Sequence, residues 1–330
     1  MVSFTPMTPS TRHRPLTRRA FLGGAVGLAA ATLAACTSSG SDNTTSTTET
    51  TPSTGPSGAP ATGDPSRPQR VVALSTGHLD HLLVLGIVPV GLAVAKSTGT
   101  DVRGIPDYIT ERFGDSLDLS SIEIVGVRQS PDLEKIAQLH PDLILSNNRS
   151  EKAQLDQLRG IATVVTTNGG AEQWKDDLGI VGDALGLREK SDQLLADYEE
   201  QARTWASSRG DSPSVSLVRG RNTEYVLTGP LSLAGSVVAD AGFTRPAGQD
   251  FTDTANHDLS LENTDQLEAD HLFYAFEGGA EQVVDSASWK TLSVVSRGDA
   301  HQVDIDPWFL NASLVAAERV LDDLKRMIGE

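Results

Sequence analysis

Short apolar runs bounded by turn residues alternate with helix-period segments along residues 69–330. Apolar runs of this length are typical of buried strands, whereas apolar positions spaced three or four apart indicate helices packed on one face. Their alternation predicts an α/β fold. The predicted strands are Val71–Leu74, Val88–Val94, Ile122–Val125, Leu143–Leu145 and Ala162–Val165 in the first half, and Val215–Val218, Tyr225–Leu227, His271–Phe276 and Gln302–Ile305 in the second.

A long helical stretch, residues 172–207, separates the two sets of strands and is expected to break near Gly186. Twenty helical residues extend roughly 30 Å, about the width of a small domain, so the later part can bridge two lobes. The sequence thus predicts two α/β lobes joined by a long interlobe helix, with a cleft between them. On this helix, Leu194, Tyr198, Ala202 and Trp205 form an apolar stripe.

Shorter helices are expected at His78–Leu85, Pro131–Leu139, Leu231–Ala241 and Asn311–Met327. Asn311 is the expected N-cap of the last one.

The first 36 residues resemble an export and anchoring signal. Thr17-Arg18-Arg19-Ala20-Phe21-Leu22 matches a twin-arginine signal, and Leu33-Ala34-Ala35-Cys36 matches a lipobox that ends in the only cysteine. The apolar run between them is shorter than the roughly 20 residues of a spanning helix, whereas two acyl chains on Cys36 hold a protein at a bilayer. We therefore expect residues 1–35 to be removed and the mature chain to be anchored outside the cytoplasmic membrane. An ordinary secretory signal is the alternative.

The amino-acid composition indicates a flexible tether before residue 69 and an acidic body after it. Residues 36–68 are mostly Ser, Thr, Gly, Pro and Ala, too polar to offset the entropy of ordering. The body then divides into an N-terminal lobe at 69–170, a linking helical segment at 171–210 and a C-terminal lobe at 211–330. The formal net charge of −17 becomes more negative when the signal, with four arginines and no acid, is lost. This charge argues against nucleic acid as a partner, and a monomer is expected.

Several motifs of the body resemble those of substrate-binding proteins of iron-siderophore ABC importers. They are Arg70-Val71-Val72-Ala73-Leu74 with residues 79–91, residues 126–136 with 140–145, and Asp306-Pro307-Trp308-Phe309 with residues 320–324. The resemblance covers residues 69–328. It implies a receptor without catalytic residues or a cofactor, which captures a ferric siderophore and delivers it to a membrane permease driven by an ATPase. Cobalamin and haem binders share the fold and stay open as alternatives.

Arginines are the predicted ligand-binding residues. Arg128 lies between a predicted strand and Pro131, in a strand-to-helix loop where α/β proteins carry binding residues. The resemblance implies that Arg128 contacts the metal-binding oxygens of the chelate, a task that suits a planar, permanently charged guanidinium. A surface salt bridge is the alternative. The resemblance also implies cleft positions for Arg149, beside Asn147 where relatives carry a lysine, and for Arg219, for which Arg221 could substitute.

One aromatic and two acidic residues also receive roles from the resemblance. Trp308 is expected at the rim of the cleft, where it covers apolar parts of the ligand, next to Leu310 at a second, usually aromatic position. Trp289 is expected in the core. Glu134 on the first lobe and Glu262 on the second are expected to dock onto arginines of the permease, although composition alone makes them two of 44 acids.

Other chemistries have weaker support. His78 and His81, with Asp80 between them, have the spacing of two zinc ligands on one helical face, but solvated histidines at a helix start are favoured because no motif supplies a third ligand. The resemblance implies that iron is held through the siderophore and not by protein ligands. An anchored hydrolase is disfavoured because no nucleophile elbow, P-loop or zinc-protease helix is present. A direct transition-metal binder is the remaining alternative.

Overall fold

The computed structural model of the chain describes residues 67–95, 104–221, 224–277 and 284–329. The predicted signal sequence, Cys36 and nearly all of the predicted tether lie outside these ranges, so their roles stay predictions. Within the described ranges, no helix combines the length and the apolar character needed to cross a membrane.

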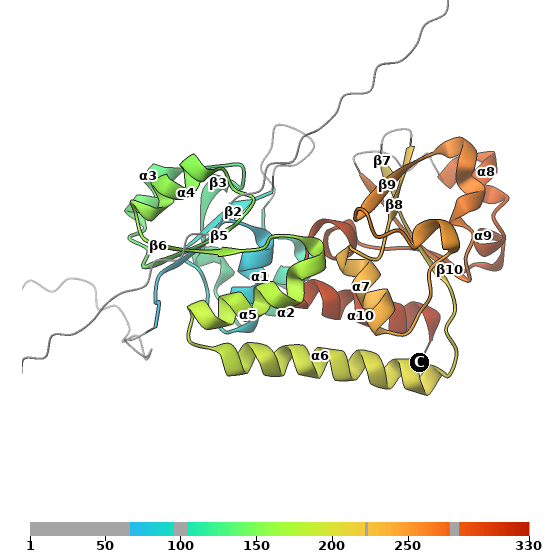
Figure 1. Cartoon of the computed structure of the whole chain (residues 1–330), viewed down its shortest axis with the longest axis horizontal. Coiled ribbons are helices and arrows are strands. Elements are labelled where there is room, and N and C mark those ends of the chain that lie inside the picture. Colours follow the sequence, from blue (N-terminus) through green and yellow to red (C-terminus); the bar gives the residue numbers. More distant parts are fainter. Residues whose placement is uncertain (1–66, 96–103, 222–223, 278–283, 330) are drawn as a thin grey trace, which may run out of the picture. The chain divides into compact units, whose positions relative to one another are not determined.

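A six-stranded sheet and its helices form the first lobe (Figure 1). Its elements are β1 (Val71–Ala73), α1 (Thr76–Val84), β2 (Gly91–Val94), α2 (Asp107–Phe113), η1 (Leu119–Ser121), β3 (Glu123–Val127), β4 (Ser130–Pro131), α3 (Leu133–Gln138), β5 (Leu143–Asn147), α4 (Lys152–Arg159) and β6 (Thr163–Thr167). The strand order is β4-β3-β2-β1-β5-β6, and all neighbours are parallel except the short antiparallel pair of β3 and β4.

Helices cover both faces of this sheet, as a buried parallel sheet requires. Alternate residues of β1 show the two faces: Val71 packs in one core cluster with Leu79 of α1, and Val72 packs in another with Ile136 of α3 and Leu158 of α4. The strand order reverses at β1, which pairs with β2 on one side and β5 on the other. Open α/β sheets bind ligands at the carboxyl ends of their strands beside such a reversal.

Two helices, α5 (Trp174–Ala184) and α6 (Arg188–Arg209), follow the first lobe after the short η2 (Ala171–Gln173). The expected break near Gly186 is confirmed: this glycine has φ +63°, a backbone conformation that ends α5 and turns the chain into α6. The 22 residues of α6 make it the long helix in Figure 1. Its predicted stripe faces the core, since Tyr198, Ala202 and Trp205 are buried.

The second lobe contains a five-stranded sheet in the order β11-β10-β7-β8-β9. The strands β7, β10 and β11 are parallel, whereas β8 is antiparallel to both of its neighbours. The elements are β7 (Val215–Arg221), β8 (Glu224–Thr228), α7 (Leu233–Asp240), η3 (Ala247–Gln249), β9 (Asn256–Ser260), η4 (Leu261–Leu267), β10 (His271–Glu277), α8 (Ala287–Lys290), α9 (Ser293–Arg297), β11 (Ala300–Gln302), a π-helix, η6 (Asp306–Leu310), and α10 (Leu314–Ile328). Two sheets with flanking helices confirm the predicted α/β class.

The C-terminal segment corrects two details of the prediction. The last strand ends at Gln302, where the predicted strand was to begin, and the chain then enters the π-helix. The N-cap of α10 is Ser313 and not Asn311. The side chain of Ser313 does not cap the helix itself; it donates to Asp80 of α1, whose carboxylate also accepts the N–H of Val315.

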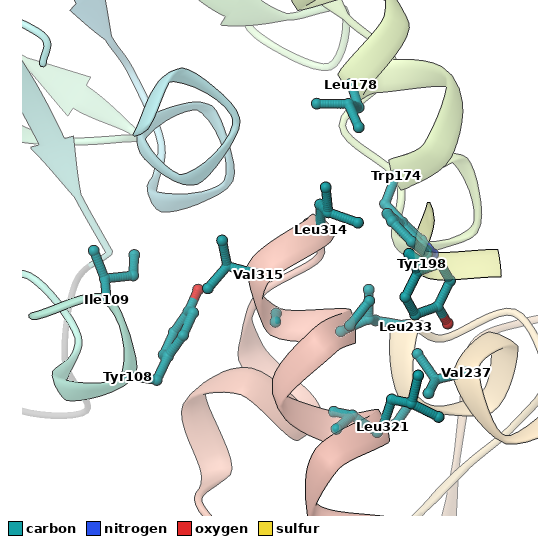
Figure 2. Close-up of a cluster of buried hydrophobic side chains, with 14 of the residues drawn as sticks. Tyr108, Ile109, Trp174, Leu178, Tyr198, Leu233, Val237, Leu314, Val315 and Leu321 are labelled. Atoms are coloured by element: carbon teal, nitrogen blue, oxygen red, sulfur yellow. The ribbon is translucent and has the colours of Figure 1, made fainter. Parts of the chain in front are cut away.

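The helix α10 packs against helices of both lobes, which joins them through one apolar core. Figure 2 shows α10 with Leu314, Val315 and Leu321 pointing into this cluster. Tyr108 and Ile109 of α2 lie on one side of α10, and residues of α5, α6 and α7 lie on the other (Figure 2). These side chains include Trp174, Leu178, Tyr198, Leu233 and Val237.

Candidate ligand-binding site

A cavity of about 690 Å³ is lined by residues of both lobes. The first lobe contributes the loops at the carboxyl ends of β1, β2, β3, β5 and β6, and the second contributes the carboxyl ends of β7 and β10 with the segment around η6. A cavity of this size lies within the usual range for small-molecule sites, and strand ends are where α/β folds present binding residues. We refer to this cavity as the cleft.

Arg128 lines the cleft from the tip of a tight hairpin. Val127 of β3 pairs with Ser130 of β4, which leaves Arg128 and Gln129 as the two turn residues. The N–H of Arg128 donates to the carbonyl of Val94 at 2.9 Å, which fixes the base of the side chain. Among the described residues, no carboxylate lies within ion-pair distance of this exposed guanidinium. The guanidinium is therefore available to an anionic ligand.

Arg219 lines the same cleft from the second lobe, near the end of β7. Its Nη1 donates to Oε1 of Glu277 at 2.5 Å, and the side chain is only 12% exposed. Burial lowers the pKa of Arg219, and the charge of Glu277 opposes this shift. Two residues further along β7, Arg221 also lines the cleft, but it donates to Glu224 and Asp258.

His78 and His81 line the cleft from α1, His78 in its first turn and His81 in its last. The expectation that they are solvated is wrong, because their exposed fractions are 3% and 2%. Nε2 of His78 shares a hydrogen bond of 3.0 Å with Oγ1 of Thr167. Burial, together with the charge of Arg128, lowers the pKa of His78 to about 4, and burial next to His78 lowers the pKa of His81 to about 3. Both imidazoles are therefore neutral near pH 7.

A direct metal site has little support in the part of the chain that the structure describes. No group of three or more His, Cys, Asp or Glu there is placed to hold a metal ion. His78 and His81 thus have no third protein ligand within the described ranges.

Asn147, the last residue of β5, lines the cleft, whereas Arg149, two residues further on, does not. Oδ1 of Asn147 accepts the N–H of Arg149 at 3.0 Å. Gly169, at φ +72°, packs on Asn147 so closely that an added Cβ would lie 2.7 Å from the Cβ of Asn147. Arg149 is not a lining residue of the cleft: it pairs with Glu172 at 3.3 Å and its side chain is 61% exposed. Its predicted ligand contact stays a prediction.

Trp308 does not lie at the rim of the cleft, and that expectation is wrong. Its side chain is fully buried, stacked on Phe273 with ring centroids 4.8 Å apart, and its Nε1 donates to Asp323 of α10 at 3.0 Å. The π-helix turns Trp308 inward and Leu310 outward. Leu310 lines the cleft and is 42% exposed. Trp289 is buried in the second lobe, as expected.

Glu134 and Glu262 are exposed residues in the first turns of short helices. Glu134 belongs to α3 of the first lobe, and Glu262 belongs to η4 of the second. Neither carboxylate forms an ion pair with another described residue. Their side chains are accessible to a partner, and the predicted docking role stays a prediction.

Several residues of the cleft lining have no counterpart among the sequence predictions, and the acid paired with Arg219 is one of them. Glu277 is the last residue of β10, and its side chain is 17% exposed beside Arg219. An acid at the carboxyl end of a predicted strand is a signal that the sequence does contain. The sequence does not show that this acid lies beside Arg219, because that contact depends on the pairing of β10 with β7.

Two α/β lobes joined through helices, with a polar cleft at their strand ends, define a solute-binding protein. Residues 71–299 match the periplasmic binding protein family, and the chain belongs to that family. The family and the relatives described below are binding proteins, and the predicted family resemblance is confirmed.

Individual relatives cover most of the chain. The probable siderophore-binding lipoprotein YfiY of Bacillus subtilis (strain 168) is 31% identical over 321 residues, which cover 90% of this chain and 94% of the relative. The Fe(3+) dicitrate-binding periplasmic protein FecB of Escherichia coli (strain K12) is 26% identical, covering 78% and 83%. The crystal structure of Staphylococcus aureus SirA complexed with staphyloferrin B has a TM-score of 0.67 at 26% identity, covering 80% of this chain and 94% of SirA.

Proposed function

We propose that this protein captures a ferric siderophore in the cleft and delivers it to the permease of an ABC importer. The observation that carries the proposal is that Arg128 and Arg219, from different lobes and 91 positions apart in the sequence, line one cavity. The names of YfiY and FecB, a siderophore binder and a ferric dicitrate binder, support the same class of ligand. Binding and release are the whole activity, and no residue is assigned to catalysis.

The charges of the cleft suit a chelate better than a bare ion. Guanidinium groups donate to the oxygens that surround the iron, and iron stays bound to the siderophore. The neutral imidazoles of His78 and His81 and the amide of Asn147 add hydrogen-bonding groups that do not change the charge of the cleft. Leu310 offers an apolar contact at the rim.

We further propose that Cys36 carries the lipid that holds the receptor at the outer face of the cytoplasmic membrane. YfiY is a lipoprotein by name, which supports this assignment. Replacement of Cys36 by serine (C36S) should move the protein from the membrane fraction to the soluble fraction after export. Retention of C36S in the membrane fraction would contradict the anchor.

Calorimetric titration of the purified protein tests the ligand. The probes are ferric complexes of hydroxamate, catecholate and citrate-type chelators, together with cobalamin and haem, and equilibrium dialysis against free zinc and manganese runs in parallel. We expect saturable, micromolar or tighter binding of at least one ferric chelate. Binding of cobalamin, haem or free metal ions alone would replace the ligand class while leaving the family assignment intact.

A further inference from the structure

Arg219 enters the cleft already paired with an acid. β7 and β10 are neighbouring parallel strands, with Arg219 opposite Ala275 and Arg221 opposite Glu277. The Glu277 side chain reaches Arg219, so that Oε1 lies 2.5 Å from Nη1. Both side chains line the cleft, and both are largely buried, at 12% and 17% exposed. The pair therefore sits where a bound ligand would meet it.

This pairing makes the two ends of the cleft electrostatically different. At the first lobe, Arg128 has no carboxylate within ion-pair distance among the described residues. At the second lobe, the charge of Arg219 is offset by Glu277, and Arg221 is offset by Glu224 and Asp258. Of these three acids, Glu277 is the one that lines the cleft itself. The cleft lining also contains Asp177, which accepts the N–H groups of Asn168 and Gly169, and Asp306, but neither forms a described ion pair with Arg219 or Arg221.

A carboxylate inside a partly buried cavity acts on any charge that enters it. Coulomb energies at a few ångströms are much larger there than in water, and they scale with the charge of the ligand. An anionic chelate must approach Glu277 or displace it from Arg219, and either event reduces its affinity. A neutral or cationic chelate does not meet this barrier. Discrimination by a built-in repulsive group is a common way to obtain specificity.

Resting on the proposed function, we infer that Glu277 is a specificity-determining residue that limits how much negative charge the bound chelate can carry. It does so as the internal counter-ion of Arg219. A purely structural pair would instead hold Arg219 in position for every ligand alike. The two roles predict different results when Glu277 loses its charge but keeps its shape.

Glu277→Gln is the variant that separates them. The Gln amide oxygen still accepts from Arg219, so the guanidinium keeps its position, while one negative charge leaves the cleft. The matched control is Glu224→Gln, which removes an acid paired with Arg221 outside the cleft lining. Circular dichroism and thermal unfolding check that both variants fold as the wild-type protein does.

The probes are two iron complexes of opposite charge, ferric citrate as an anion and ferrioxamine B, whose pendant ammonium makes it a cation. Calorimetry should show that E277Q binds ferric citrate about tenfold more tightly than the wild type, with no gain for ferrioxamine B. E224Q should show neither change. The double variant R219Q/E277Q should lose the gain, because the freed guanidinium is then absent.

Equal gains or equal losses for both complexes in E277Q, or no measurable change for ferric citrate, would overturn the assignment. Absence of ferric citrate binding by both wild type and E277Q would overturn it as well. The proposed function fails separately, when the wild-type protein binds no ferric chelate of the panel at all.

Discussion

Oδ2 of Asp80 lies 2.5 Å from Oγ of Ser313, although the two residues are 233 positions apart in the chain. Oδ1 of the same carboxylate accepts the N–H of Val315 at 3.2 Å, so a residue of α1 caps the N-terminus of α10. The hydroxyl of Tyr108 donates at 3.4 Å. Burial raises the pKa of Asp80 to about 7 despite these hydrogen bonds, and the nearby charge of Glu318 adds to the rise.

Asp80→Asn should change how stability depends on pH. Because the pKa of Asp80 rises from 3.8 to about 7 on folding, the folded protein binds the extra proton, and this contribution to the free energy of unfolding is lost as pH rises towards 7. Urea unfolding of both proteins at about pH 5 and about pH 8 measures it. The wild type should lose about 2 kcal/mol more than D80N between these values. Equal losses would show that Asp80 does not titrate on folding.

His78 and His81 should change the pH dependence of stability in the opposite direction to Asp80. Burial holds the pKa values of His78 and His81 at about 4 and about 3, below their ordinary value of 6.5, so the unfolded chain takes up protons first as pH falls. The stability that they contribute is lost below about pH 6.5. H78Q/H81Q should therefore lose at least ~2 kcal/mol less than the wild type between about pH 7 and pH 4.5. Replacement of the exposed His140 by Asn is the control and should leave this slope unchanged.

Arg128→Gln should weaken binding of whichever ferric chelate the titration identifies. A hydrogen bond to a charged group contributes about 1.5–3 kcal/mol, so a ten- to hundredfold loss of affinity is expected. Arg149→Gln gives the comparison: Arg149 is exposed, pairs with Glu172 and does not line the cleft, so its predicted ligand contact should cost less affinity when it is removed. A larger loss in R149Q than in R128Q would reverse the assignment of these two arginines.

Trp308 and Leu310 should separate stability from binding. Trp308→Phe removes a buried indole and its hydrogen bond to Asp323, and should lower the free energy of unfolding by about 1–3 kcal/mol with little effect on affinity. Leu310→Ala removes an exposed side chain at the cleft, so it should weaken ligand binding and leave the free energy of unfolding nearly unchanged. Chemical denaturation and calorimetry on both variants measure the two effects. Strong loss of binding in a stable W308F would restore Trp308 as a ligand contact.

Charge reversal at Glu134 and Glu262 should abolish transport while leaving capture intact. Both carboxylates are exposed, on different lobes, and unpaired among the described residues, so lysine there should not disturb the fold. E134K/E262K should bind the ferric chelate as the wild type does, but cells that carry it should take up little iron from that chelate. Uptake at the wild-type rate would show that the permease uses another surface.

The fold was largely predictable because most elements bury many residues of a regular pattern. β1 is fully buried, and α6 has a clear apolar stripe, so periodicity identifies both. The helices α2 and α4 were not predicted. α4 buries only Leu158, and α2 buries only Tyr108 and Ile109, so neither short helix contains a set of buried positions like those from which α6 and α10 were predicted.

Sequence analysis could locate some cleft residues because they lie at or just after the end of a predicted strand. Arg128 and Arg219 are such residues, and both line the cleft. His78 is buried and shares a hydrogen bond with Thr167, which lies 89 positions away, and no local pattern predicts that contact. Trp308 faces inward because the π-helix changes the direction of its side chain, a conformation that the motif does not encode.

The position of α10 has a consequence for engineering. Its fifteen residues belong by sequence to the C-terminal half, yet they pack on α1, α2 and α5. Together with its N-cap Ser313, the helix supplies two donors to the carboxylate of Asp80. A fragment that stops at residue 210 is therefore not a self-sufficient half-receptor, and split versions or swaps of one lobe between relatives must carry this helix along. Reporter insertions for an iron-chelate sensor belong in surface loops, away from the C-terminal helix.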